Sequence, residues 1–63
     1  MKTPNPIMMF FEYEHLPDHL QAVSKPFCDL AQEIERHYSD SAEKSAGLRK
    51  LLEAKDCIVR AAL

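Results

Sequence analysis

The sequence of 63 residues has few of the features that usually stabilise a very small domain. It contains two cysteines, Cys28 and Cys57, and no Cys-x-x-Cys pair, so it indicates neither a disulfide framework nor a zinc finger. A domain of this size buries only about 60% of its unfolded surface and is marginal as a monomer. A single bridge between Cys28 and Cys57 stays open as an alternative. Oligomerisation is the stabilising device that we expect.

The sequence also lacks an excess of either charge and has no long hydrophobic run. Its net charge is -2 and 29% of its residues are charged, which is an ordinary balance for a soluble protein. This balance argues against binding to a nucleic-acid polymer, which requires a strongly basic face. No segment approaches the roughly 20 apolar residues of a membrane span, and residues 1–11 are too short for a signal peptide. We therefore expect a cytoplasmic protein without a membrane partner.

Catalytic motifs are missing as well. The sequence has no nucleophile elbow, no glycine-rich phosphate loop and no H-E-x-x-H pattern. His15 and His19 stand four residues apart and could share a helix face, but Pro17 between them makes that spacing unreliable. The acidic residues of the second half of the chain are typical of a solvated face. We expect no enzyme, no cofactor and no metal site, and keep a metal-binding regulator as a minor alternative.

The strongest structural signal is an amphipathic helix over residues 41–63. Asp40 and Glu43 have the spacing of a capping box. Charged residues, Lys55 among them, lie mostly off the apolar stripe that follows. The single glycine, Gly47, lies inside this helix and costs about 1 kcal/mol relative to alanine unless a close contact uses it. The apolar stripe consists of Leu48, Leu51, Leu52, Ala54, Ile58, Val59 and Ala62.

A second helix is predicted over residues 24–38. Pro17 suits the first turn of a short helix over residues 17–22, whereas Pro26 would break a continuous helix. We therefore expect a restart with Ser24 as the N-cap. The face of the restarted helix is marked by Phe27, Leu30, Ala31, Ile34 and Tyr38.

An N-terminal arm over residues 1–15 precedes the helices. Two prolines make residues 1–6 irregular, and residues 7–11 form a short apolar run. Because an exposed apolar run is costly in so small a chain, this run should contact another surface. We favour an arm laid on a partner, and keep a short strand or an extended lid over the helices as alternatives.

These elements predict an all-α fold with one domain over residues 1–63. The domain is a two-helix antiparallel hairpin with an N-terminal arm. A shorter helix and an arm cannot cover Leu48, Leu52 and Val59 together. We therefore expect the hairpins to assemble into a helical homo-oligomer.

Aromatic and cationic residues ahead of the hairpin outline a nucleotide site. Tyr13 precedes the first helix, and Lys25 lies in its expected first turn, where free backbone amides favour an anion. A base stacked on Tyr13 with its phosphate near Lys25 would be physically sensible. The plain alternative is that Tyr13 packs on the hairpin and Lys25 is solvated. Lys44 and Arg49 likewise have simple interpretations, in helix initiation and on the solvated face of a helix.

The order of the motifs resembles a known family. F-x-Y occupies residues 11–13, L-A-x-x-I residues 30–34, S-x-E-K-S residues 41–45 and L-x-x-L-x-E-A residues 48–54. This order is similar to the hairpin domain shared by phage anti-CBASS and Thoeris anti-defence sponge proteins. The resemblance covers roughly residues 11–62. After E-A, where the family often has an aromatic residue, this chain has Asp56 and Cys57.

The resemblance implies a non-enzymatic protein of the infected bacterial cytoplasm that sequesters a cyclic nucleotide immune signal. The signal would be a cyclic dinucleotide, a cyclic trinucleotide or a molecule of the cyclic ADP-ribose type. Such proteins form compact helical oligomers, often hexamers, with ligands between subunits. In this chain the resemblance assigns base stacking to Tyr13 and phosphate contacts to Lys25, or a neighbour near Cys28, and to Arg49. The full set of candidate ligand-binding residues is Phe11, Tyr13, His15, Lys25, Lys44 and Arg49. The alternative function is a small protein-interaction module that docks its apolar stripe on a host or phage protein.

Overall fold

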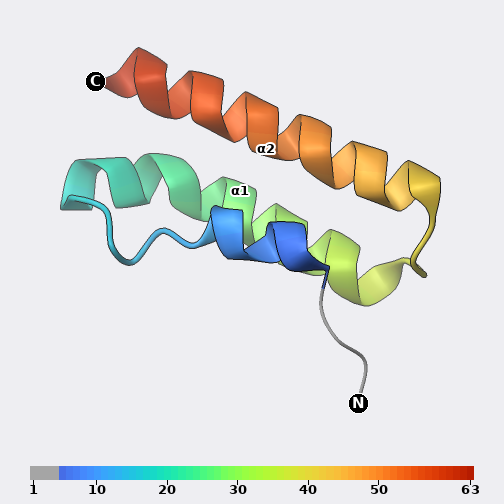
Figure 1. The fold of residues 1–63 in the computed structure, drawn as a ribbon. Coiled ribbons are helices and arrows are strands. Elements are labelled where there is room, and N and C mark those ends of the chain that lie inside the picture. The colour runs from blue at the N-terminus through green and yellow to red at the C-terminus, as the bar shows by residue number, and fades with distance from the viewer. Residues whose placement is uncertain (1–4) are drawn as a thin grey trace.

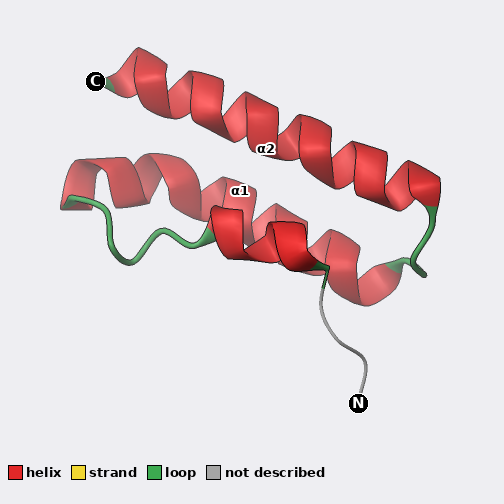
Figure 2. Cartoon of the chain, in the orientation of Figure 1, coloured by secondary structure: helices red, strands yellow, loops and turns green. Residues whose placement is uncertain are grey.

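The computed structural model describes residues 5–63, which form one short helix and two long ones (Figure 1). The 3₁₀ helix η1 spans Pro6–Phe11, and the α-helices α1 and α2 span Asp18–His37 and Ala42–Ala62. The two α-helices lie side by side and run in opposite directions, and η1 contacts both of them. Figure 2 shows no strand among the described residues. The predicted all-α hairpin with an N-terminal arm is confirmed, and its assembly into an oligomer stays a prediction.

The core lies where η1 meets the hairpin. Phe11 from η1, Cys28 and Ala31 from α1, and Leu48 from α2 form one buried cluster. Phe11 and Leu48 have no exposed surface at all. Residues 6–11 therefore lie over the helices of their own chain, as the alternative of a lid expected, although they form a 3₁₀ helix rather than an extended segment. The cluster is surrounded by half-buried apolar residues, namely Ile7, Met8, Tyr13, Phe27, Ile34, Leu51 and Leu52.

The arm begins with a capped turn of helix. The Asn5 side chain accepts a hydrogen bond from the Ile7 amide at 3.1 Å, and Pro6 occupies the first helical position. Proline is tolerated there because its missing N–H would have no helical partner anyway. The alternative of a strand over residues 7–11 is wrong. Of the segment 1–6 that we expected to be irregular, residues 1–4 lie outside the described residues.

The expected break at Pro26 is wrong, because α1 runs through it without interruption from Asp18. Ser24, the expected N-cap, is a buried residue inside the helix. Proline removes the hydrogen bond to the Ala22 carbonyl, a loss that is costly in a buried helix. Here Ala22 and Pro26 are both exposed, so water can meet the orphaned carbonyl. The long contact with α2 then holds the helix together across the proline.

The N-cap of α2 is Ser41 rather than Asp40. Ser41 has an extended backbone, and its hydroxyl accepts a hydrogen bond from the Lys44 amide at 3.0 Å. The Asp40 carboxylate instead accepts from the Lys44 ammonium at 3.1 Å. The expected capping box of Asp40 and Glu43 is therefore corrected. Serine is as good an N-cap as aspartate, so one-residue shifts of this kind are hard to predict.

The apolar stripe of α2 is covered better than the sequence suggested. Leu48 is fully buried within the single chain, while Leu52 and Val59 are half-buried. Several other large apolar side chains are exposed, namely Met9, Phe10, Leu30, Tyr38, Ile58 and Leu63. Within residues 5–63, no helix combines the length and apolar character needed to cross a membrane.

The two cysteines are separate free thiols. Cys28 is buried in the core and Cys57 is exposed on α2. Burial raises the pKa of the Cys28 thiol, and the nearby Asp29 carboxylate raises it further. Because the reactive form of cysteine is the thiolate, Cys28 is a packing residue rather than a nucleophile.

Candidate functional site

Tyr13 and Lys25, the two residues at the centre of the expected nucleotide site, lie near each other. Tyr13 is half-buried and packs against the core cluster. The Lys25 ammonium is exposed and pairs with Asp29 at 2.9 Å. Its hydrogen bond to Asp29 raises the pKa of Lys25, and the hydroxyl of Tyr13 is close enough to add to that rise. Tyr13, held against the core, thus lies within electrostatic range of the exposed Lys25 ammonium.

The backbone around Lys25 differs from the expectation. Lys25 was expected in a first turn, but α1 begins seven residues earlier, at Asp18. The amide groups around Lys25 therefore belong to the middle of a helix and offer no free donors. Any anion held at this place depends on the side chain of Lys25 alone.

The side chains of Phe11 and Lys44 are buried rather than exposed. Phe11 is 0% exposed, so its ring belongs to the core and cannot reach a ligand without a rearrangement. The Lys44 side chain is 2% exposed, and its ammonium lies among the last residues of α1. We therefore replace the ligand-binding roles expected for these two residues with roles in packing and in the α1–α2 turn.

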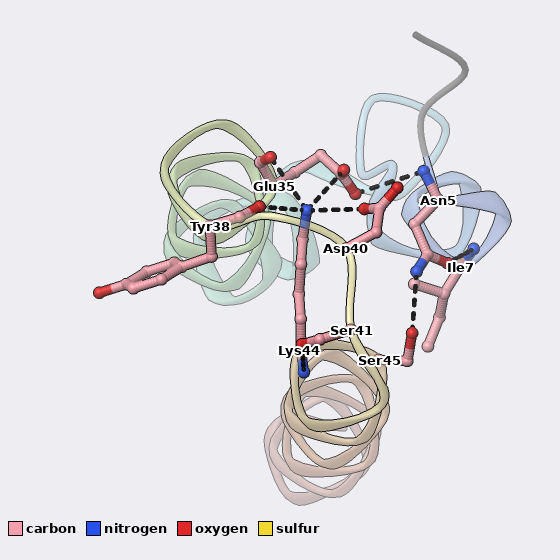
Figure 3. A network of polar contacts seen from close by, with 8 residues as sticks. All are labelled: Asn5, Ile7, Glu35, Tyr38, Asp40, Ser41, Lys44 and Ser45. Atoms are coloured by element: carbon pink, nitrogen blue, oxygen red, sulfur yellow. Dashed lines mark hydrogen bonds and ion pairs between the residues drawn. The ribbon is translucent and has the colours of Figure 1, made fainter.

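Figure 3 shows how many acceptors surround the Lys44 ammonium. It donates to the Tyr38 carbonyl at 2.7 Å and to the Glu35 carbonyl at 3.2 Å, both at the end of α1. It also donates to the carboxylates of Glu35 at 3.0 Å and Asp40 at 3.1 Å. A cation at this position stabilises the terminal carbonyls and the negative end of the helix dipole.

The network around Lys44 extends to the arm. The Asn5 amide donates to the second oxygen of Glu35 at 3.3 Å, and the Asn5 side chain donates to the Ser45 hydroxyl at 3.4 Å (Figure 3). Burial alone would lower the pKa of the Lys44 ammonium. The hydrogen bonds to Glu35 and Asp40 outweigh burial and leave that pKa above its ordinary value. Lys44 thus joins the arm, α1 and α2 at one end of the hairpin.

Lys55 is a second buried lysine that the sequence interpretation missed. It is 8% exposed, and its ammonium donates to the Phe10 carbonyl at 2.5 Å. It lies 5.9 Å from the centre of the Phe11 ring, within the range of a cation–π contact. Lys55 stands at helical spacing from residues 44, 48, 52 and 59, which places it on the buried face of α2. This spacing is visible in the sequence.

His15 and Arg49 complete the predicted set. His15 is exposed and lines a cavity of about 380 Å³ between the arm and the two helices, which Lys55 also lines. Arg49 is exposed on α2, and the cavity with His15 does not include it. Of the predicted set, Tyr13 and Lys25 lie within electrostatic range of each other, whereas His15 lines a cavity that includes neither of them.

No three histidine, cysteine or acidic side chains of residues 5–63 are grouped so that they could hold a metal ion. Comparison of the chain with protein-family models, with curated proteins and with solved structures gave no match.

Proposed function

We propose that this protein is a non-enzymatic sponge that binds a cyclic nucleotide immune signal and withholds it from its effector. The observation that carries the proposal is that the half-buried Tyr13 lies within electrostatic range of the exposed Lys25 ammonium. A nucleotide presents a flat base and an anionic phosphate at a short, fixed separation. Aromatic stacking is worth about 1–3 kcal/mol per base and a charged hydrogen bond adds to it, so the pair suits that ligand.

The order of motifs supports the same function. F-x-Y, L-A-x-x-I, S-x-E-K-S and L-x-x-L-x-E-A follow one another at the spacing that resembles the anti-CBASS and Thoeris anti-defence hairpin domain. Tyr13 of that pattern is the residue that lies within electrostatic range of Lys25. Arg49 is the further phosphate contact that the resemblance assigns.

A second subunit would complete the site. Tyr13 and Lys25 form an open surface, and neither residue lines the cavity of about 380 Å³. Tight small-molecule sites bury most of the ligand surface. We therefore propose that the ligand is enclosed between hairpins of a homo-oligomer, for which a hexamer is the expected form. Ligand binding and assembly should then strengthen each other.

Thermal unfolding against a panel of ligands tests this function. The panel holds cyclic dinucleotides, cyclic trinucleotides and cyclic ADP-ribose isomers, each with its linear hydrolysis product as a control. A ligand at about 100 times its dissociation constant should stabilise the native state by about 2.7 kcal/mol, which in so small a domain is a shift of many degrees. We expect a shift with one class of cyclic ligand only.

Two variants and one control tie that shift to the proposed residues. Lys25→Gln and Tyr13→Leu should each reduce the shift without lowering the melting temperature of the free protein by a comparable amount. Lys50→Gln changes an exposed lysine of α2 and serves as the matched control, which should keep the full shift. The proposal fails if no member of the panel stabilises a protein that is folded and oligomeric.

The exposed apolar residues favour one alternative, a protein-interaction module. Leu30 and Tyr38 stand exposed on α1, beside a shallow cavity of about 210 Å³ that Ile34 also lines. Under this alternative, Leu30→Asp would abolish the effect of the protein on phage infection while Tyr13→Leu and Lys25→Gln would leave it unchanged. Under the sponge proposal, Tyr13→Leu and Lys25→Gln would abolish it.

A further inference from the structure

The cavity of about 380 Å³ between the arm, α1 and α2 is lined by a mixture of apolar and cationic side chains. Its apolar walls include Phe10 and Val59, and its cationic groups are Lys55 and Arg60. Ligand sites in proteins commonly combine a volume of roughly 300–1,000 Å³, apolar walls and a few placed polar groups. The cavity has this composition, and the residues named for the sponge function, apart from His15, lie outside it.

The Lys55 ammonium has donor capacity that the chain does not use. An ammonium carries three donors, and the Phe10 carbonyl takes one of them. The next oxygen, from the half-exposed Asp56 carboxylate, stands 3.8 Å away, which is an ion pair but too long for a hydrogen bond. Lys44, at the other end of the hairpin, donates to four oxygens from a similarly buried position. Lys55 is thus a buried cation with room for a further acceptor.

Two more groups of the cavity need partners. The Ser24 hydroxyl is fully buried and has no hydrogen-bond partner among the described residues. An unpaired buried hydroxyl is unusual enough to require an explanation. The exposed Arg60 guanidinium donates to the Cys57 sulfur at 3.5 Å, a weak acceptor, and has no other hydrogen bond within residues 5–63, so it is accessible to a ligand. Ser24, Lys55 and Arg60 come from two helices and line one cavity.

The acidic residues of the cavity restrict what it can hold. Glu12 and Asp56 also line it, so its formal charge is close to balanced. Because the two carboxylates offset the two cations, the cavity has no net positive charge to attract a multiply charged anion such as phosphate, and one carboxylate group suffices to meet Lys55 and Arg60. The apolar walls favour a ligand with a flat or aliphatic body. Charge and shape together select a small amphipathic monoanion.

We propose that this cavity is a binding site for a small carboxylate with an apolar body. The carboxylate accepts hydrogen bonds from Lys55 and Arg60 at the cavity, and the apolar body lies against Phe10 and Val59. The proposal does not depend on the cyclic nucleotide function.

Naphthalene-2-carboxylate is a suitable probe, and its binding is followed by two-dimensional NMR of the labelled full chain. The neutral naphthalene-2-carboxamide keeps the apolar body without the charge, and acetate keeps the charge without the body. We expect saturable shifts at Lys55, Arg60 and Val59 with the probe. Binding of either control compound should be weaker by about tenfold or more, the loss expected when a charged hydrogen bond or the buried body is removed.

Variants connect the binding to the cavity. Arg60→Gln changes an exposed arginine and should weaken binding of the probe about tenfold while the chain stays folded. Lys55→Met should do the same, and circular dichroism checks that it folds. Lys50→Met, on the outer face of the same helix, should bind as the unchanged protein does. Equal binding of the carboxamide, equal binding by Arg60→Gln, or no saturable shift at the cavity would each overturn the proposal.

Discussion

Two lysines of α2 show how one residue type takes different roles through its surroundings. Lys44 and Lys55 are both buried, and both lie on the face of α2 that packs against the rest of the chain. Lys44 is saturated by four oxygens from the α1–α2 turn. Lys55 has one close oxygen and a cavity in front of it. We therefore assign Lys44 to stability and Lys55 to binding.

Replacing Lys44 should destabilise the fold in a pH-dependent way. Its pKa is raised in the folded chain above the ordinary value of 10.5, so its contribution is fully present below that pH. The contribution is lost as pH rises through the folded-state pKa, because the neutral amine no longer attracts Glu35 and Asp40. Urea unfolding at about pH 8 should therefore show Lys44→Met well below the unchanged protein, and the difference should shrink at about pH 11.5.

The exposed Lys50 gives the matched control for this experiment. Lys50→Met should leave the urea midpoint nearly unchanged at either pH, because exposed charges contribute little to stability. A Lys44→Met difference that stays constant across this pH range would contradict the role assigned to the ammonium. It would point to the apolar stem of Lys44 as the stabilising part.

Removing the unpaired hydroxyl of Ser24 should stabilise the free protein. Burying the serine hydroxyl without a hydrogen bond costs free energy of folding, and alanine is the better helix former. We expect Ser24→Ala to raise the free energy of unfolding by about 0.5–1 kcal/mol, measured by urea denaturation without ligand. A clear loss of stability would mean that the hydroxyl already has a partner in the free protein.

At the scale of elements, α1 contains a proline that the hairpin tolerates. Pro26 leaves the Ala22 carbonyl without its helical donor, on a side of α1 that water reaches. Pro26→Ala should restore that hydrogen bond and raise the free energy of unfolding by about 1–3 kcal/mol. Thermal unfolding of the two proteins measures the gain. An unchanged or lower stability would show that the proline shapes α1 for a contact with another molecule.

The sequence predicted those parts of the fold that depend on local periodicity. The apolar stripe of α2 identified that helix within a residue at each end, and the predicted turn at Ser39 and Asp40 lies within the connection between α1 and α2. The continuity of α1 could not be read locally, because packing against α2 offsets the cost of Pro26. The 3₁₀ helix of the arm was missed for a similar reason, since it depends on the place that Phe11 finds in the core.

The candidate site was only partly predictable. The site of Tyr13 and Lys25 stays a prediction, and the first-turn position expected for Lys25 is wrong because α1 begins at Asp18. The burial of Lys44 was not anticipated, because its acceptors come from residues of α1 and the turn that no spacing rule connects to it. The burial of Lys55 could be read from its helical spacing relative to the apolar stripe, but its charge led us to place it on the exposed face.

At the scale of the whole molecule, a substitution at Gly47 tests whether another chain or a ligand contacts α2 at this position. A side-chain carbon added at Gly47 would meet no atom within 4 Å in the single chain. Gly47→Ala should therefore raise the free energy of unfolding by about 1 kcal/mol through helix propensity. Denaturation at low and high protein concentration measures it, together with sedimentation velocity. Loss of stability or of assembly would show that another chain or a ligand approaches the backbone at Gly47.

The most direct test of the sponge function follows the ligand itself. The cyclic nucleotide that stabilises the protein is incubated with it, the complex is isolated by gel filtration, and the ligand is released by denaturation and identified by mass. The account predicts that the ligand elutes with an oligomer and returns chemically intact in stoichiometric amount. Recovery of a linearised or hydrolysed product would contradict it and make the protein an enzyme.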